Sequence, residues 1–154
     1  MRETKVRTGN ESVGVSDMVT RRGQATDASV ARLRADAEEG RALARELARA
    51  IDDKKGRDIV ILDISGQSSF ADCFVNATAT NTRMLATLSE EVGDILSRKG
   101  FDIRGVEGRP ESGWVLVDCG DVIVNLFLAE QREKYQIEKI WGDATRIDVD
   151  ENAE

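Results

Sequence analysis

The stretch WVLVDCGDVIVNLF, residues 114–127, restricts the fold of this chain more than any other segment. It consists of two apolar runs, rich in the β-branched residues that favour strands, on either side of the tetrapeptide Asp-Cys-Gly-Asp. Because successive side chains of a strand point to opposite faces, runs that are apolar at almost every position need cover on both faces. The stretch therefore predicts a β-hairpin in the middle of the fold.

The tetrapeptide between the two runs contains two carboxylates, which could have a structural role or a functional one. Asp118 and Asp121 can be the two sides of a turn, the polar edge of a partner-binding face, or a metal-binding pair. Aspartate is common in turns because its carboxylate accepts hydrogen bonds from nearby backbone N–H groups, and no third metal ligand is in sight. We predict a turn centred on Cys119 and Gly120, with Gly120 at positive φ. This turn predicts three opposed pairs: Asp118 with Asp121, Leu116 with Ile123, and Trp114 with Asn125.

The rest of the chain alternates between helix-like and strand-like patterns. Apolar residues spaced by three and four predict helices, and short β-branched runs predict strands. The predicted elements are a helix over 26–55, in one piece or broken at Gly40, strands over 58–64, 70–77 and 101–108, a helix over 80–99, and a helix over 129–141. We expect Ile140 and Trp141 to pin the last helix to the sheet. This order indicates an α/β protein with a mixed sheet and helices packed on it.

The composition excludes several classes of function. The chain has no histidine, which rules out Ser-His and Cys-His nucleophiles and imidazole metal ligands. Its two cysteines lack CxxC spacing, so we expect core residues in a reducing, cytoplasmic setting rather than disulfides or a zinc site. The net charge of -7 argues against a nucleic-acid clamp, and no apolar run approaches the roughly 20 residues that span a bilayer. We expect neither a cofactor nor a membrane contact.

Several separated motifs carry a resemblance to a known family. They are DIVILDISGQSSFADCFVNATATNTR at 58–83, VEG at 106–108, the hairpin stretch itself, and REKYQIEKIWGDA at 132–144. In this order they resemble the Iojap family, whose bacterial members are called ribosomal silencing factors. The resemblance covers residues 36–146 and leaves a flexible N-terminal extension, 1–35, and an acidic tail, 147–154. One departure is Asn125, where many members carry histidine; asparagine stays polar but cannot take up a proton near neutral pH.

The resemblance implies a fold, a partner and a mechanism. The implied fold is related to the nucleotidyltransferases, with a five-stranded mixed sheet flanked by helices, and the protein is often a homodimer. Members bind the large ribosomal subunit through large-subunit protein number fourteen, which leaves at most minor contact with ribosomal RNA. Their bulk then blocks association with the small subunit and represses translation in starvation or stationary phase. Organellar members instead assist assembly of the large subunit.

The nucleotidyltransferase relationship raises a rival function, in which the chain still binds or transfers nucleotides. That chemistry needs two acids at Asp-x-Asp spacing on one strand, because alternation then points both carboxylates at one metal pair. Asp148 and Asp150 have this spacing but lie in the tail, and Asp63 stands alone at the end of its strand. We therefore expect the fold without the catalytic acids, and a binding protein rather than an enzyme.

Three large side chains are the candidates for holding the ribosomal partner. Trp114 begins its strand beside the proline-containing loop, and Arg132 and Tyr135 lie one helical turn apart and so share a face. Trp, Tyr and Arg are the residue types that most often dominate interfaces. The resemblance places the ribosomal contact on this surface, so we predict these three as anchors, with Lys134 and Lys139 as rim charges. The competing interpretations are core packing for the aromatic residues and a solvated helix face for the charged ones.

Overall fold

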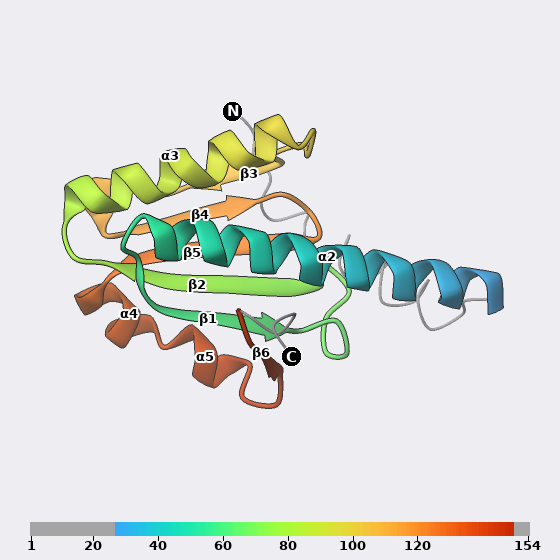
Figure 1. Ribbon diagram of the computed structural model, residues 1–154. Helices are drawn as coiled ribbons and strands as arrows, with labels where there is room; N and C mark the ends of the chain where they lie inside the picture. The colour runs from blue at the N-terminus through green and yellow to red at the C-terminus, as the bar shows by residue number, and fades with distance from the viewer. Residues whose placement is uncertain (1–26, 150–154) are drawn as a thin grey trace.

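A computed structural model describes residues 27–149 of the chain. These residues form a six-stranded mixed sheet in the order β3-β4-β5-β2-β1-β6, with helices on both faces (Figure 1). The strands are β1 (Arg57–Asp63), β2 (Cys73–Ala79), β3 (Gly105–Glu107), β4 (Trp114–Asp118), β5 (Val122–Leu128) and β6 (Thr145–Ile147). The α/β class predicted from the sequence is confirmed. Most of the predicted N-terminal extension, 1–35, lies outside the described residues.

The described sheet has six strands, where the family resemblance implied five. The additional strand, β6, pairs antiparallel with the end of β1, from Ile147 opposite Ile61 to Thr145 opposite Asp63. Residue 147, where the sequence predicts the acidic tail to begin, is therefore the last residue of a strand. Among the described strands, parallel pairing joins β2 to β5 at the centre of the sheet, and the other neighbours are antiparallel.

Two long helices, α2 (Asp27–Asp53) and α3 (Thr82–Arg98), cover one face of the sheet (Figure 1). They bury the larger of two apolar clusters, which includes Leu47, Leu88 and Val124. Helix α2 runs through Gly40 without a break. A Cβ added at Gly40 would lie 3.2 Å from the Cβ of Asp72, so this glycine permits close packing of the helix rather than ending it.

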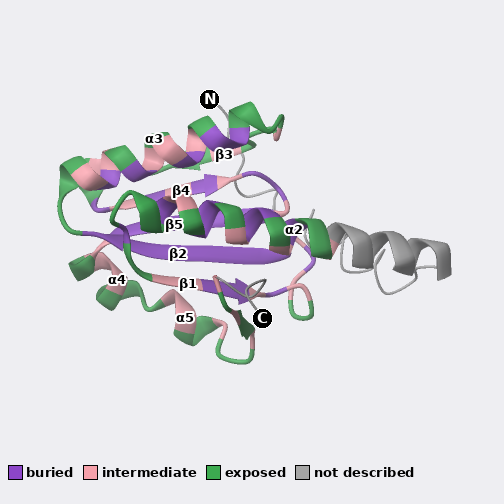
Figure 2. Cartoon of the chain, viewed as in Figure 1, coloured by how far each residue is buried: buried purple, intermediate pink, exposed green. Residues whose placement is uncertain are grey.

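Two short helices, α4 (Ala129–Tyr135) and α5 (Ile137–Ile140), lie on the opposite face. Ile137 and Trp141 pack there on a second apolar cluster that includes Phe74, and the rings of Trp141 and Phe74 meet edge to face at 5.4 Å. The prediction that Trp141 pins this segment to the sheet is confirmed. For Ile140 it is wrong, because its side chain is 69% exposed. In Figure 2 the central strands are mostly buried, whereas α4 and α5 carry only residues of intermediate or high exposure.

The predicted hairpin is confirmed, but its register differs from the expected one. The observed pairs are Asp118 with Ile123, Leu116 with Asn125, and Trp114 with Phe127. The central residues are therefore Gly120 and Asp121, and Gly120 adopts a φ of 94°. A two-residue turn with glycine first needs positive φ at that glycine alone, whereas the predicted turn would have strained Cys119. Every partner moves by two residues, so each side chain keeps its predicted face.

Several predicted elements have bounds in the structure that differ from the predicted ones. Strand β2 begins at Cys73 rather than at residue 70, and β3 is limited to Gly105–Glu107 within the predicted 101–108. The proline-containing loop holds a short 3₁₀ helix, η1 (Pro110–Ser112). The predicted helix 129–141 is interrupted at Gln136, which has a φ of 48° and separates α4 from α5.

Among residues 27–149, no helix combines the length and apolarity needed to cross a membrane.

Candidate partner-binding site

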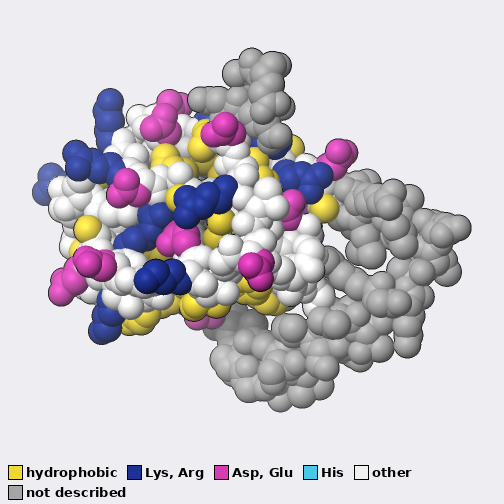
Figure 3. Space-filling view, turned by 90° about the horizontal axis from the view of Figure 1, so that it is seen from below, with side chains coloured by type: hydrophobic (Ala, Val, Ile, Leu, Met, Phe, Trp, Pro, Cys, Tyr) yellow, Lys and Arg dark blue, Asp and Glu magenta, His cyan; other side chains and the backbone are white. Residues whose placement is uncertain are grey.

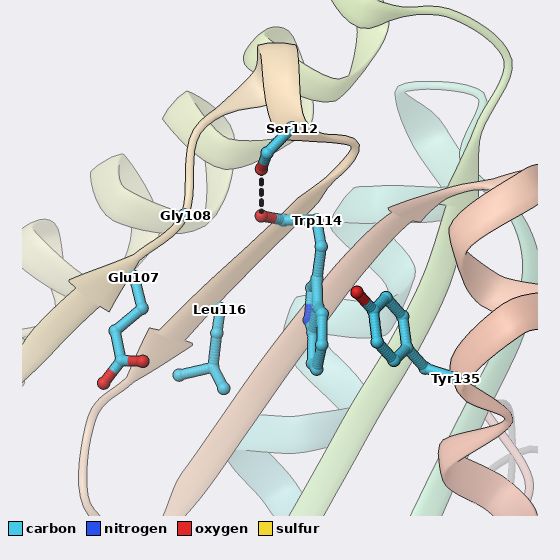
Figure 4. A pocket seen from close by; sticks show the side chains of 6 residues that line it. All are labelled: Glu107, Gly108, Ser112, Trp114, Leu116 and Tyr135. Atoms are coloured by element: carbon cyan, nitrogen blue, oxygen red, sulfur yellow. Dashed lines mark hydrogen bonds between the residues drawn. The ribbon is translucent and has the colours of Figure 1, made fainter.

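A cavity of about 240 Å³ opens on the side of β3 and β4 that α4 leaves uncovered. The residues that line it are Glu107, Gly108, Ser112, Trp114, Leu116 and Tyr135. Figure 4 shows Trp114 and Tyr135 side by side, with Leu116 and Glu107 further along the same side of the sheet. The cavity therefore has an aromatic wall at one end and a carboxylate at the other.

The aromatic wall is built from three rings in sequence. The ring of Trp114 lies 4.6 Å from that of Tyr135 and 5.0 Å from that of Phe127, measured between centroids. Phe127 is fully buried, Trp114 is half-buried, and Tyr135 is 42% exposed. The ammonium nitrogen of Lys134 lies 5.5 Å from the Tyr135 centroid, within reach of a cation–π contact. Trp114 and Tyr135 thus present a supported aromatic surface to solvent, and their role as anchors stays a prediction.

Glycine makes the rim of the cavity possible. Gly108 has a φ of 82°, and a Cβ added to it would collide with the backbone carbonyl oxygen of Trp114. The hydroxyl of Ser112 donates a hydrogen bond of 3.2 Å to the same carbonyl oxygen. Gly113, at a φ of 84°, ends η1 and turns the chain into β4. The start of β4, and with it Trp114, is therefore fixed by backbone geometry on both sides.

Behind Trp114 runs a line of buried polar side chains. The indole Nε1–H of Trp114 donates to Oδ1 of Asn125 at 3.1 Å, and Nδ2 of Asn125 donates to Oδ1 of Asn76 at 3.0 Å. Nδ2 of Asn76 then donates to Oε2 of Glu138 at 2.9 Å. Each asparagine lies in a strand made mostly of apolar residues, and both are buried with their side-chain hydrogen bonds directed along this line. The sequence shows both asparagines, but only the pairing of β2 with β5 in the fold makes them neighbours.

The side chain of Arg132 is directed inward, toward Glu138 and Thr78, rather than toward solvent. Its guanidinium forms an ion pair of 2.9 Å with Glu138 and donates a hydrogen bond of 2.9 Å to Thr78 Oγ1, and its side chain is 15% exposed. Burial alone would raise the pKa of Glu138, but the hydrogen bond from Asn76 and the charge of Arg132 outweigh burial and hold this pKa below its usual 4.5. Direct contact between Arg132 and a partner stays a prediction.

The break at Gln136 is what allows this ion pair to form. Arg132 and Glu138 are six positions apart, which in an uninterrupted helix separates two side chains by about 120° around the axis and about 9 Å along it. The left-handed conformation of Gln136 redirects the chain and brings Glu138 back to Arg132. Lys134 and Lys139 are exposed on either side of the break, and their role as rim charges stays a prediction.

Asp63 and Asp118, which are candidates from the sequence for catalytic or metal-binding roles, form hydrogen bonds within the fold. Asp63 accepts hydrogen bonds from Arg41 and from the hydroxyl of Ser65, and Asp118 accepts the backbone N–H of Gly120 at 2.8 Å, as a turn aspartate does. Within residues 27–149, no three His, Cys, Asp or Glu side chains converge as a metal site would require. Burial chiefly raises the pKa of Cys73 to about 12 and that of Cys119 to about 11. Neither thiol is activated at neutral pH.

Comparison with known proteins connects this site to a family. Residues 36–154 match the family model described as ribosomal silencing factor during starvation. The chain belongs to the ribosomal silencing factor family. It is 39% identical over 103 residues to the ribosomal silencing factor RsfS of Bacillus subtilis, covering 67% of this chain and 87% of that protein. The Haemophilus influenzae RsfS is 35% identical over 66% of this chain and 99% of its own length.

Solved structures and organellar relatives agree with this assignment. A crystal structure of a Chromobacterium violaceum protein superimposes with a TM-score of 0.62 at 40% identity, covering 68% of this chain and 85% of that one. The chloroplastic Iojap protein of Arabidopsis thaliana is 32% identical over 74% of this chain and 48% of its own length. The family names describe a ribosome-associated regulatory factor, and this is the class of protein to which the chain is assigned.

Proposed function

We propose that this chain represses translation by docking on the large ribosomal subunit and blocking its association with the small one. The contact on the subunit is its protein number fourteen, and Trp114 and Tyr135 are the anchors, with Lys134 and Lys139 at the rim. The observation that carries the proposal is the exposed aromatic wall beside an open cavity, in a chain of the ribosomal silencing factor family. Large aromatic side chains in such positions dominate many interfaces.

The mechanism is steric and requires no turnover. A docked domain of this size can bury a standard interface of about 800 Å² per partner, which suffices for a stable complex. Figure 3 shows basic and acidic side chains interspersed on the face seen from below, without a continuous basic tract over the described residues in that view. This charge pattern suits a protein partner with minor RNA contact better than a phosphate backbone. The proposed site of action is the cytoplasm, where the subunits meet.

Replacing Tyr135 with alanine tests the aromatic anchor directly. Tyr135 is exposed and its ring contacts are Trp114 and Lys134, so its removal should leave the fold intact. Affinity for purified large subunits is expected to fall by at least about thirtyfold, the equivalent of about 2 kcal/mol for a dominant interface residue. Trp114→Ala is expected to have at least the same effect. Co-sedimentation with large subunits measures both, and circular dichroism verifies folding.

Val106→Ala is the matched control for this experiment. Val106 is 57% exposed on β3 and pairs with Val117, so it points to the opposite face of the same sheet edge. This variant removes exposed apolar surface without touching the aromatic wall and should bind like the wild type. If both aromatic variants remain folded and co-sediment at wild-type levels, the proposed docking surface is incorrect.

A second function, assistance in assembling the large subunit, is favoured by one comparison. A mouse protein named for mitochondrial assembly of the ribosomal large subunit is 29% identical over 57% of this chain and 40% of its own length. The two functions predict different ribosome profiles in cells that lack the gene. Silencing predicts excess joined ribosomes in starved cells alone, whereas assembly predicts incomplete large subunits during growth. Density-gradient profiles of growing and starved cells separate the two.

A further inference from the structure

We propose that Asn125 and Asn76 are positioning residues, which hold the Trp114 ring in the orientation that meets the partner. The inference rests on the function proposed above and extends it to residues that the partner does not touch. Asn125 and Asn76 are register partners on adjacent parallel strands, and they are 1% and 0% exposed. Their amides connect the indole of Trp114 on β4 to the carboxylate of Glu138 on α5, across β5 and β2.

We call this line of hydrogen bonds, from Trp114 through Asn125 and Asn76 to Glu138, the relay. The groups at its two ends determine the direction of its hydrogen bonds. The indole N–H of Trp114 can only donate a hydrogen bond, and the ionised carboxylate of Glu138 can only accept one. Between these ends, each amide has one orientation in which its oxygen accepts and its NH₂ group donates along the line. Turning over either amide would place two donors or two acceptors face to face in a buried site, where neither finds water.

The relay therefore links the exposed part of the site to its internal ion pair. Arg132 holds Glu138 ionised and in place, Glu138 orients Asn76, and Asn76 orients Asn125. Asn125 in turn fixes the tilt of the Trp114 ring against Tyr135. The charged and titratable groups that face this line are Glu138 and Arg132 from the two C-terminal helices, Tyr135 from α4, and Glu107 across the cavity.

Asn125→His tests the relay because this chain has no histidine of its own. A neutral imidazole can accept from Trp114 and donate to Asn76, whereas a protonated one has two donors and opposes the indole N–H. As the pH is lowered from about 8 to about 6, through the usual histidine pKa of about 6.5, the Trp114 indole resonance in ¹H–¹⁵N NMR should move. The Trp141 resonance should not, and Trp114→Phe identifies which signal is which.

Affinity for large subunits should follow the same pH dependence. In Asn125→His it is expected to fall about tenfold between about pH 8 and about pH 6, the equivalent of one lost hydrogen bond. The wild type should show no such fall. Thr87→His supplies the matched control, because Thr87 is exposed on α3, on the opposite face of the sheet. Glu138→Gln supplies a second test: it removes the negative charge at the end of the line and weakens the hydrogen bond that orients Asn76, so the Trp114 resonance should move although Glu138 does not touch Trp114.

Each result decides the proposal. A Trp114 resonance that is unaffected by pH in Asn125→His and unaffected by Glu138→Gln would overturn the relay. A resonance that moves while the affinity stays constant would overturn its role in docking. Failure of the wild type to bind large subunits would overturn the proposed function, and with it the docking role. The NMR result would then still show whether the relay holds the ring, so the two failures are distinguishable.

Discussion

Replacing Arg132 with alanine is expected to lower the free energy of unfolding by about 2–3 kcal/mol, because it leaves a partly buried carboxylate without its counter-ion. The side chains of Arg132 and Glu138 are 15% and 18% exposed, so water compensates little for the lost ion pair. The hydrogen bond to Thr78 is lost as well. Urea unfolding at pH 7 measures the loss. Lys134→Ala, an exposed neighbour in the same helix, should stay within about 0.5 kcal/mol of the wild type.

The pH dependence of this loss identifies its cause. The folded pKa of Glu138 lies below 4.5, so its contribution to stability is complete above pH 4.5 and is lost as the pH falls through the lower folded value. In Arg132→Ala, burial acts on Glu138 without the opposing arginine, and the carboxyl group takes up a proton more readily. The difference from the wild type should therefore shrink in acid. A deficit below about 1 kcal/mol, or one equally large in acid, would contradict the ion pair.

The faces of the hairpin were predictable because alternation along a strand is a local property. Val115, Val117, Val122 and Val124 all point into the cluster beneath α2 and α3, as the sequence pattern predicts. The register was not predictable in the same way, since it depended on which position of the turn the glycine would occupy. The structure places Gly120 first, where positive φ is required of glycine alone. An error of two residues preserved both faces but changed the residue opposite Trp114 from Asn125 to Phe127.

The sixth strand and the helix break depend on tertiary contacts that no local pattern signals. Strand β6 has three residues, and it is a strand because β1 offers an unpaired edge there. Gln136 has no intrinsic preference for the left-handed conformation that it adopts. Helical spacing correctly placed Arg132 and Tyr135 within one turn, yet the ion pair with Glu138 turns Arg132 inward. The aromatic half of the site was therefore predictable from residue type, and its polar support was not.

The asparagines show what a fuller use of the sequence could have found. Asn76 and Asn125 each occupy a buried position in a strand made mostly of apolar residues, where an unpaired amide would be costly. Such a residue requires a partner, and two of them in neighbouring strands are candidates for each other. What the sequence could not supply was the pairing of β2 with β5, which joins segments 49 positions apart.

Replacing Phe127 with alanine is expected to lower the free energy of unfolding by about 3–5 kcal/mol, because it leaves a void in the core. The same void removes the support of the Trp114 ring, so docking is expected to weaken as well. Phe127 is fully buried at the middle of the sheet and lies opposite both Thr78 on β2 and Trp114 on β4. Its ring supports the inner side of the Trp114 ring at 5.0 Å. Without it, Trp114 can sink toward the sheet, and Tyr135 loses the surface against which it stacks. Chemical denaturation and co-sedimentation with large subunits measure the two consequences.

Phe127→Leu separates support of the aromatic wall from the general cost of a cavity. Leucine fills much of the same volume and should cost less than about 1.5 kcal/mol, so the domain stays folded. It supplies no flat ring beneath Trp114, however, and the indole resonance of Trp114 should shift while that of Trp141 stays in place. If Phe127→Ala is no less stable than Phe127→Leu, the ring is not packed as described. If both variants bind like the wild type, Trp114 does not need its inner support to meet the partner.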